Sequence, residues 1–316
     1  MGSIRQIFPK SNERWLDDAR IVWRYVPLKT LFLYLSGKIF IPSVEKLRQE
    51  DPFEGEHFFP TVWFNKALHD RYGKEHEKVF KWLEDQFTSA DFEQNRRRTG
   101  MKLQPDANAR SREKHYFDFL RKTRYAWCWF ASNRESAAMW NSYGSGGVAI
   151  SSTIGKIHTA LSKTKYDFAF GQMRYVSVVN ERTTDLVLEN SEDSQLILEP
   201  HFLKRNEYKS ENEVRFVTAT SENEIDSGIF IKKIMPEEWI EEIRLWPKAR
   251  SSEEAALKEV VKKFAPEIRC VKSDFMSRRP DATAISRIYM RDVIGISEEN
   301  EWESGRDDIP DILKYP

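Results

Sequence analysis

The sequence predicts an α+β fold with mixed, largely antiparallel sheets and a helical insertion. Short runs of β-branched and aromatic residues alternate with helical patterns from residue 21 to residue 271, and such runs between turn residues are typical of strands. Several of them are joined by short connections, which favour antiparallel pairing. From Val62 to about Arg121 the pattern is long, charged and helical without an evident strand, which indicates an insertion of helices.

Before the insertion the sequence predicts, in order, a strand at 21–26, a helix at 28–35, a strand at 38–42, a helix from residue 43 and a bend at 51–55. Pro27 ends the first strand because proline cannot donate to a sheet ladder, and Gly37 closes the first helix. Pro52 disfavours helical backbone at Asp51, so the chain turns there.

After the insertion the sequence predicts strands at 125–131, 148–151, 173–179, 211–216, 229–234, 240–246 and 268–271, helices at 132–143, 153–162 and 252–264, and the end of a helix at 199–205. Ser132, with Glu135 three residues later, fits a capping box at the start of a helix. Gly144 and the glycines that follow it end that helix.

The composition excludes several classes of protein. With 316 residues, 40% of them hydrophobic, the chain can bury one sizeable core, and its net charge of zero gives no long-range attraction for nucleic acid or anionic membrane. Cys128 and Cys270 are too few for a disulfide framework and are not spaced as metal ligands. No apolar run has the length of a secretory signal or of a membrane span. We therefore expect a cytoplasmic protein with no membrane partner and no bound metal.

The same patterns predict how the chain is divided. We expect an N-terminal extension at 1–20, an α+β domain at 21–275 with the helical insertion at about 62–121, and a C-terminal tail at 276–316. The tail is polar and becomes acidic toward its end, so we expect it to be only partly ordered.

Two carboxylates stand at the start of the strand predicted at 211–216. Residues two apart in a strand share a face, so Glu211, Glu213 and Arg215 are expected to point one way, with Val214 and Phe216 toward the core. Paired carboxylates on a rigid strand suit an enzyme that stabilises a cationic, sugar-like transition state. The alternative is a solvated row of charges with a cross-strand ion pair.

A set of short motifs between about residues 20 and 275 carries a family resemblance. The motifs are Trp23-Arg24-Tyr25, Ser36 to Pro42, Asp51 to Gly55, Met139-Trp140 with Tyr143, Gly147 to Ile150, Tyr208 with Glu211 to Phe216, and Ile240 to Ile243. Together they resemble a bacterial family catalogued only as domain of unknown function 2971. This resemblance implies a family but no activity.

A second series resembles the arginine, serine and glutamate residues of ADP-ribosyltransferases: Arg24 on the first strand, Ser132 at a strand-to-helix junction, and Glu211 with Glu213 on a later strand. The resemblance implies an ADP-ribosyltransferase-like core in which the substrate NAD lies in a cleft between two antiparallel sheets. It also implies that Arg24 holds the NAD phosphates, Ser132 supports the site and Glu213 binds the nicotinamide ribose. The Ser-Thr-Ser triplet of that superfamily is absent at Ser132, and a Ser-Ser-Thr stands at 151–153.

The chemistry of NAD gives these positions a reason. Departure of nicotinamide leaves an oxocarbenium-like ribose, which an ionised Glu213 would stabilise, while Glu211 would orient or deprotonate the acceptor. A planar arginine fork at Arg24 suits a pyrophosphate. Tyr25, Trp129, Trp140 or Tyr143 could stack on the nicotinamide or adenine ring of NAD. Arg24 and Tyr25 face opposite sides of a strand, so one of the two is expected to enter the cleft.

Each of these positions also has a purely structural interpretation. Arg24 fits a surface ion pair, and Ser132 fits an N-cap that needs no ligand. Trp140 and Tyr143 lie three residues apart on a helix, which is typical of a packed core face.

The strongest basic cluster lies in the insertion. It comprises Arg96, Arg97, Arg98, Lys102, Arg110, Arg112 and Lys114. Such a cluster can contact phosphates, although a charge run on a helix is also typical of a solvated face.

The leading hypothesis is an NAD-dependent ADP-ribosyltransferase acting on a macromolecule, with RNA or DNA favoured over protein, as a toxin or phage-defence effector that an inhibitory partner protein would control. One alternative is a non-catalytic module that binds protein or nucleic acid. Another is a nucleic-acid processing enzyme that holds Mg²⁺ with Asp51, Glu54 and Glu213.

Overall fold

The computed structural model describes residues 4–6, 16–56, 61–75, 77–78, 105–176, 178–179, 182–183, 199–220 and 228–276. The chain forms two units, Met1–Ser273 and Asp274–Pro316, and every element named below belongs to the first. Among the described residues, no helix combines the length and apolar character needed to cross a membrane.

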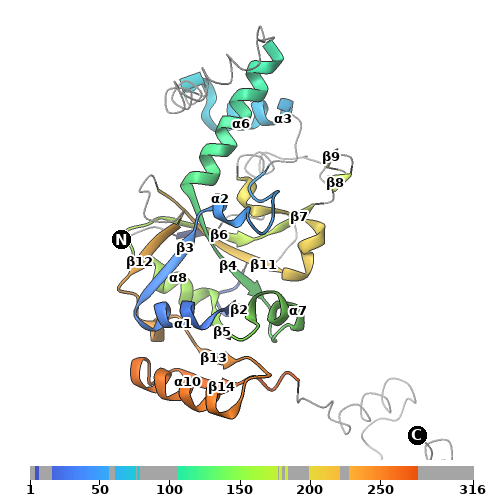
Figure 1. The fold of residues 1–316 in the computed structure, drawn as a ribbon. Helices are drawn as coiled ribbons and strands as arrows, with labels where there is room; N and C mark the ends of the chain where they lie inside the picture. The colour runs from blue at the N-terminus through green and yellow to red at the C-terminus, as the bar shows by residue number, and fades with distance from the viewer. Residues whose placement is uncertain are drawn as a thin grey trace, which may run out of the picture. The chain divides into compact units, whose positions relative to one another are not determined.

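A sheet of eight strands forms the frame of the first unit (Figure 1). Its order is β1 (Ile4–Gln6), β6 (Phe168–Gln172), β11 (Glu213–Ala219), β4 (Arg124–Ala131), β2 (Ile21–Val26), β5 (Val148–Thr153), β13 (Glu242–Leu245) and β14 (Arg269–Lys272). The edge pairs β1–β6 and β13–β14 are parallel, and the pairs between them are antiparallel. With helices packed on this sheet, the prediction of an α+β fold with largely antiparallel pairing is confirmed.

Smaller strand pairs and helices surround the sheet. The pairs are β3 (Lys38–Pro42) with β12 (Gly228–Lys232), β7 (Arg174–Val176) with β10 (Leu203–Arg205), and β8 (Val178–Val179) with β9 (Arg182–Thr183). The α-helices are α1 (Leu28–Leu35), α2 (Val44–Leu47), α3 (Thr61–Tyr72), α6 (Pro105–Thr123), α7 (Ala137–Met139), α8 (Ile154–Ser162) and α10 (Ser251–Phe264). Tighter or wider turns of helix are η1 (Gly73–Glu75), the π-helix η2 (Trp140–Gly144), η3 (Pro200–Phe202), η4 (Asn206–Glu211) and η5 (Pro236–Glu238).

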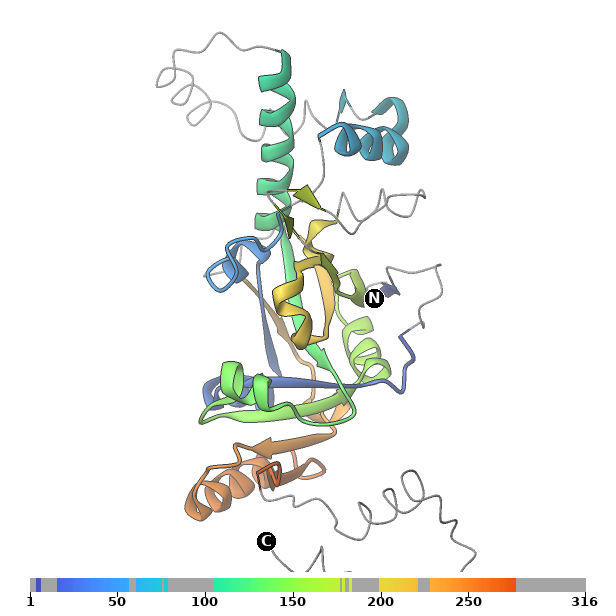
Figure 2. The same cartoon turned by 90° about the vertical axis from the view of Figure 1, so that its right-hand side faces the viewer.

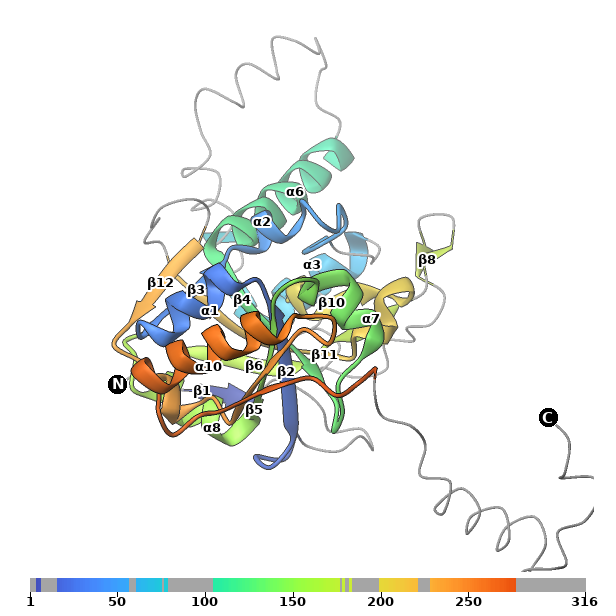
Figure 3. The same ribbon diagram turned by 60° about the horizontal axis from the view of Figure 1, so that its bottom comes forward.

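The main core lies on the face of the sheet that α1, α8 and α10 cover (Figure 3). Apolar side chains of these helices pack there against alternate residues of the strands, as the period of two requires. Trp127, Trp239 and Tyr34 form its centre, with ring centroids 5.1 Å apart in the edge-to-face contacts of Trp239 with the other two. Large buried aromatic rings therefore fix the position of α1 on the sheet.

The helical insertion begins and ends near the opposite face. Figures 1 and 2 both show α6 leading away from the sheet, and α3 lies beside it. Residues 79–104 of the predicted insertion and residues 277–316 of the predicted tail lie outside the described residues.

Several predicted elements differ from the observed ones. The sequence analysis does not predict β1 or β6, and the helix end predicted at 199–205 is wrong, because η3 and the strand β10 occupy those residues. The capping box at Ser132 is also wrong. Helix α7 begins later, and Ser136 is its N-cap, with Oγ accepting a hydrogen bond from the N–H of Met139 at 3.3 Å. The carboxylate of Glu135 instead accepts hydrogen bonds from Arg244, from Trp140 Nε1 at 2.9 Å and from Ser273.

The strand predicted to open at Glu211 opens two residues later. Glu211 ends η4, and Asn212 adopts left-handed backbone with φ of 39° before β11 begins at Glu213. Asparagine tolerates this conformation better than most residues. Glu211 therefore does not lie on the strand face that carries Glu213 and Arg215.

Candidate functional site

A fork in the sheet opens into a large cavity. Strand β2 pairs with β5 along its whole length, but with β4 it pairs only at Val22 and Trp23. Beyond Trp23 the strands β2 and β4 diverge, and a cavity of about 880 Å³ lies between them. Residues of α1, β3, β10, η4 and β11 and the segment 46–54 complete its walls.

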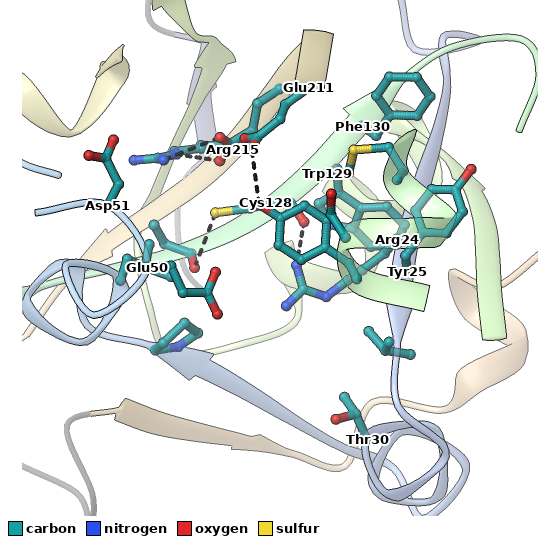
Figure 4. A pocket seen from close by; sticks show the side chains of 18 of the residues that line it. Arg24, Tyr25, Thr30, Glu50, Asp51, Cys128, Trp129, Phe130, Glu211 and Arg215 are labelled. Atoms are coloured by element: carbon teal, nitrogen blue, oxygen red, sulfur yellow. Dashed lines mark hydrogen bonds and ion pairs between the residues drawn. The ribbon is translucent and has the colours of Figure 1, made fainter. Parts of the chain in front are cut away.

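Arg24 occupies the fork. Its Nε donates a hydrogen bond to the hydroxyl of Tyr34 at 3.0 Å, and its Nη1 donates to the carbonyl of Cys128 on β4. Figure 4 shows the guanidinium beside Cys128 within the cavity. Among the described residues no carboxylate forms an ion pair with Arg24, a half-buried cation that lines the cavity.

The contacts of Arg24 and Tyr25 distinguish the roles of the two side chains at the cavity. Tyr25 packs edge-to-face against Trp140, with ring centroids 5.0 Å apart, and its hydroxyl accepts a hydrogen bond from the N–H of Ser136 at 2.8 Å. The ring of Tyr25 is thus held in a second aromatic cluster with Trp23 and Phe130. Arg24 supplies the polar group in the cavity, while Tyr25 forms part of its wall.

A buried ion network closes one side of the cavity. Arg215 is 1% exposed, and its guanidinium donates to both oxygens of Glu54, at 2.5 and 2.8 Å, and from Nε to Glu213 at 2.5 Å. The carbonyl of His201 accepts a further bond from Arg215 at 2.8 Å. The alternative of a solvated row of charges is therefore wrong for Glu213 and Arg215, which are both buried.

The bend at 51–55 places Glu54 in this network. Asp51 Oδ1 accepts a hydrogen bond from the N–H of Phe53 at 3.0 Å, which tightens the turn. Gly55 has a φ of +68°, and a Cβ at this position would lie 2.6 Å from a methyl carbon of Val44. Only glycine fits both conditions, so the Asp-Pro-Phe-Glu-Gly sequence directs Glu54 at Arg215.

Lys204 forms ion pairs with both Glu211 and Glu213. Its Nζ lies 2.5 Å from Glu211 Oε2 and 3.2 Å from Glu213 Oε2, and 4.7 Å from the ring centroid of Tyr208. The other oxygen of Glu211 accepts a hydrogen bond from the hydroxyl of Tyr143 at 2.8 Å. Glu211 and Glu213 thus converge although they lie on different elements.

These contacts determine the charge of each group. Burial alone would raise the pKa of Glu213, but the charges of Arg215 and Lys204 outweigh it and lower the pKa from 4.5 to about 2. Burial would lower the pKa of Lys204, yet the neighbouring Glu213 and Glu211 raise it above its ordinary value. Burial and the charge of Glu211 raise the pKa of Tyr143. At neutral pH Glu213 is therefore ionised and Tyr143 keeps its proton.

The depressed pKa of Glu213 makes stability depend on acid pH. Its carboxylate stabilises the folded state fully above the unfolded-state pKa near 4.5, and this contribution is lost as the pH falls through about 2. We expect the free energy of unfolding to decline between pH 4.5 and 2 by a smaller amount in Glu213→Gln than in the wild type. Urea unfolding of both proteins across this range measures the difference, and identical declines would contradict it. Glu207→Gln, at an exposed position, should decline as the wild type does.

Of the other predicted site residues, some line this cavity and others do not. Tyr143 lines it from η2, and Asp51 and Glu54 line it from the bend. Ser132 does not line it, since its Oγ accepts a hydrogen bond from the N–H of Arg134 at 3.1 Å outside the cavity. Ser152, in the alternative triplet, bonds to the carbonyl of Trp239 in the core. Of the expected core pair, Trp140 is buried and Tyr143 is 36% exposed.

Most residues of the basic cluster lie outside the part of the chain that the structure describes. Arg96, Arg97, Arg98 and Lys102 lie outside the described residues, and Arg110 and Arg112 lie on α6 at positions whose side chains are not described. Lys114 is exposed on the same helix.

The carboxylates considered for Mg²⁺ all have cationic partners. Arg215 stands between Glu54 and Glu213, and Arg205 pairs with Asp51 at 3.3 Å. Within the described residues, no group of three or more His, Cys, Asp or Glu side chains is arranged to hold a metal ion.

Sequence reasoning missed Lys204 and named Tyr208 only as part of a family motif. Lys204 lies in the segment expected to end a helix, and the short strand β10 lacks the alternation that marks a half-buried strand. No local signal distinguishes the buried Lys204 from an exposed lysine, because its partners come from β11 and from the end of η4.

Comparison with known proteins adds one finding. No curated protein and no solved structure matches the chain. Residues 139–216, which include Tyr143, Lys204, Glu211, Glu213 and Arg215, match the family model described as "Protein of unknown function (DUF2971)", in support of the resemblance noted from the sequence.

Proposed function

We propose that the chain is an NAD-dependent ADP-ribosyltransferase that binds NAD in the fork between β2 and β4 and modifies a macromolecular acceptor. The observation that carries the proposal is that Arg24 and the carboxylate pair Glu211 and Glu213, which are far apart in the sequence, line one cavity. In this proposal the core is ADP-ribosyltransferase-like, with the sheet opening at the fork to admit NAD.

The phosphate end of NAD is assigned to Arg24 and the start of α1. Lys29 and Thr30, in the first turn of α1, line the cavity, and no side chain caps this helix N-terminus. Helix N-termini carry partial positive charge and free N–H groups that favour anions. Arg24 adds a planar cation with no carboxylate partner in the described part of the chain.

The ribose end is assigned to Glu211 and not to Glu213, which reverses the roles expected from the resemblance. Both oxygens of Glu213 are engaged by Arg215 and Lys204, and the side chain is 6% exposed. Glu211 also has a partner on each oxygen, Lys204 and Tyr143, but its side chain is 14% exposed and borders the cavity. A ribose hydroxyl can therefore donate to a remaining lone pair of this carboxylate. Glu213 then serves to fix the position of Lys204.

The reaction is a displacement at the anomeric carbon of the nicotinamide ribose. The bond from that carbon to the nicotinamide nitrogen breaks, and its electron pair leaves with neutral nicotinamide. The carboxylate of Glu211 stabilises the cationic ribose that develops. A nucleophilic oxygen or nitrogen of the acceptor forms the new bond and loses its proton to a carboxylate or to water.

The sequence favours nucleic acid as the acceptor. The basic residues from Arg96 to Lys114 favour RNA or DNA over protein, because lysine and arginine on an insertion can follow a phosphate backbone. Modification of cytoplasmic nucleic acid suits a toxin or a phage-defence effector, which an inhibitory partner protein would restrain.

Two labels on NAD test the reaction. The purified protein is incubated with a lysate divided into protein, RNA and DNA fractions, and with NAD labelled either on the adenylate phosphate or on nicotinamide. We expect the phosphate label in a nucleic-acid fraction and the nicotinamide label in free nicotinamide. Absence of both, with folded wild-type protein, would contradict the proposal and favour a binding module.

A further inference from the structure

We infer that Lys204 is a positioning residue that aims Glu211 at the ribose of NAD and supplies the positive charge beside its carboxylate, an inference that rests on the proposed function. It gives a role to a buried lysine that no sequence motif identified.

The geometry around Nζ of Lys204 leaves little freedom. Two carboxylates contact the ammonium, Glu211 at 2.5 Å and Glu213 at 3.2 Å. The ring of Tyr208 lies 4.7 Å away on another side, in a cation–π contact. The lysine side chain is only 8% exposed. Its charge is thus confined to the space between the two glutamates.

Glu211 depends on this charge more than Glu213 does. Glu213 keeps Arg215 as a second cation, bonded at 2.5 Å, whereas Lys204 is the cation that pairs with Glu211 among the described residues. Without Lys204, Glu211 would stand beside an ionised Glu213 with only the hydroxyl of Tyr143 as a donor. Two neighbouring carboxylates do not both ionise readily, and the proton would go to the partly exposed Glu211.

Titratable and charged groups from several elements of the described chain surround this pair. They are Lys204 from β10, Tyr208 from η4, Tyr143 from η2, Cys128 from β4, Glu213 and Arg215 from β11, Tyr175 from β7, and Glu50 and Glu54 from the segment after α2. Of these, Lys204 and Arg215 are the cations, and Arg215 bonds to Glu54 and Glu213. Removal of Lys204 therefore leaves Glu211 without its cation, whereas Glu213 keeps Arg215.

The test is the pH dependence of nicotinamide release from NAD. In Lys204→Gln we expect the acid limb of the rate profile to move up by about 1–3 pH units, the usual effect of losing an adjacent opposite charge. Lys204→Arg, which keeps the charge, should leave the limb near its wild-type position. The double variant Lys204→Gln with Glu213→Gln removes one charge of each sign. The acid limb of its rate profile should move to higher pH by less than in Lys204→Gln.

The outcomes separate this inference from the proposed function. Active Lys204→Gln protein with an unchanged acid limb would overturn the inference alone, and the charge-balanced double variant supplies the same comparison if the single variant does not fold. Wild-type protein that releases no nicotinamide would overturn the proposed function. A carbon-13 NMR titration of the glutamate carboxyls, assigned with Glu211→Gln, then still decides whether Lys204 lowers the pKa of Glu211.

Discussion

Arg215→Met should lower the free energy of unfolding by about 3–5 kcal/mol, the usual cost of removing one partner from a buried ion pair. Arg215 is 1% exposed, and it is bonded to Glu54 and Glu213, which are themselves 2% and 4% exposed. Methionine fills much of the same volume but leaves two carboxylates without their shared cation. They must then take up protons or draw in water, and either response destabilises the fold.

Urea unfolding at neutral pH measures this effect. The matched control is Arg269→Met, since Arg269 also lies on a strand and pairs with a glutamate, Glu242, but its side chain is 71% exposed. Exposed pairs contribute little, so we expect a change within about 1 kcal/mol for the control. Equal losses in the two variants would contradict the account of the buried network.

Glu211→Gln should reduce the rate of nicotinamide release by about 10²–10³-fold, the usual cost of removing one preorganised group that stabilises charge in the transition state. Glutamine keeps the size of the side chain but cannot balance a cationic ribose. The side chain is only partly buried, and Arg215, Glu54 and Glu213 stay bonded to one another. We therefore expect the loss in rate without unfolding.

The control for this variant is Glu207→Gln, an exposed glutamate on the same turn of helix η4 that does not line the cavity. Its rate should equal that of the wild type. Full activity in Glu211→Gln, with loss in a folded Glu213→Gln, would instead restore the roles expected from the family resemblance.

Local patterns predict much of the frame of this fold. The strand at 21–26 and the helix at 28–35 agree residue for residue with β2 and α1, because Pro27 and Gly37 fix where each ends. Alternation also predicts that Val214 and Phe216 face the core. Residues close together in the sequence are sufficient to determine these element boundaries and strand faces.

The site depends on contacts between distant segments, and these are less predictable. The family resemblance singles out Arg24 and the glutamate pair, and all three line one cavity, while their roles stay a prediction. The fork does not follow from either strand alone, since it reflects where β2 stops pairing with β4. Glu211 was expected on the strand because the left-handed backbone of Asn212 leaves no pattern in the surrounding residues.

Calorimetric titration of NAD into the purified protein tests the central claim, that the fork between β2 and β4 is an NAD site. We predict binding by the wild type, weakened about 10–100-fold in Arg24→Met by the loss of charge-assisted hydrogen bonds, and unchanged binding in Arg134→Met, at an exposed arginine outside the cavity. Equal affinity in Arg24→Met, or no binding by folded wild-type protein, would contradict the claim.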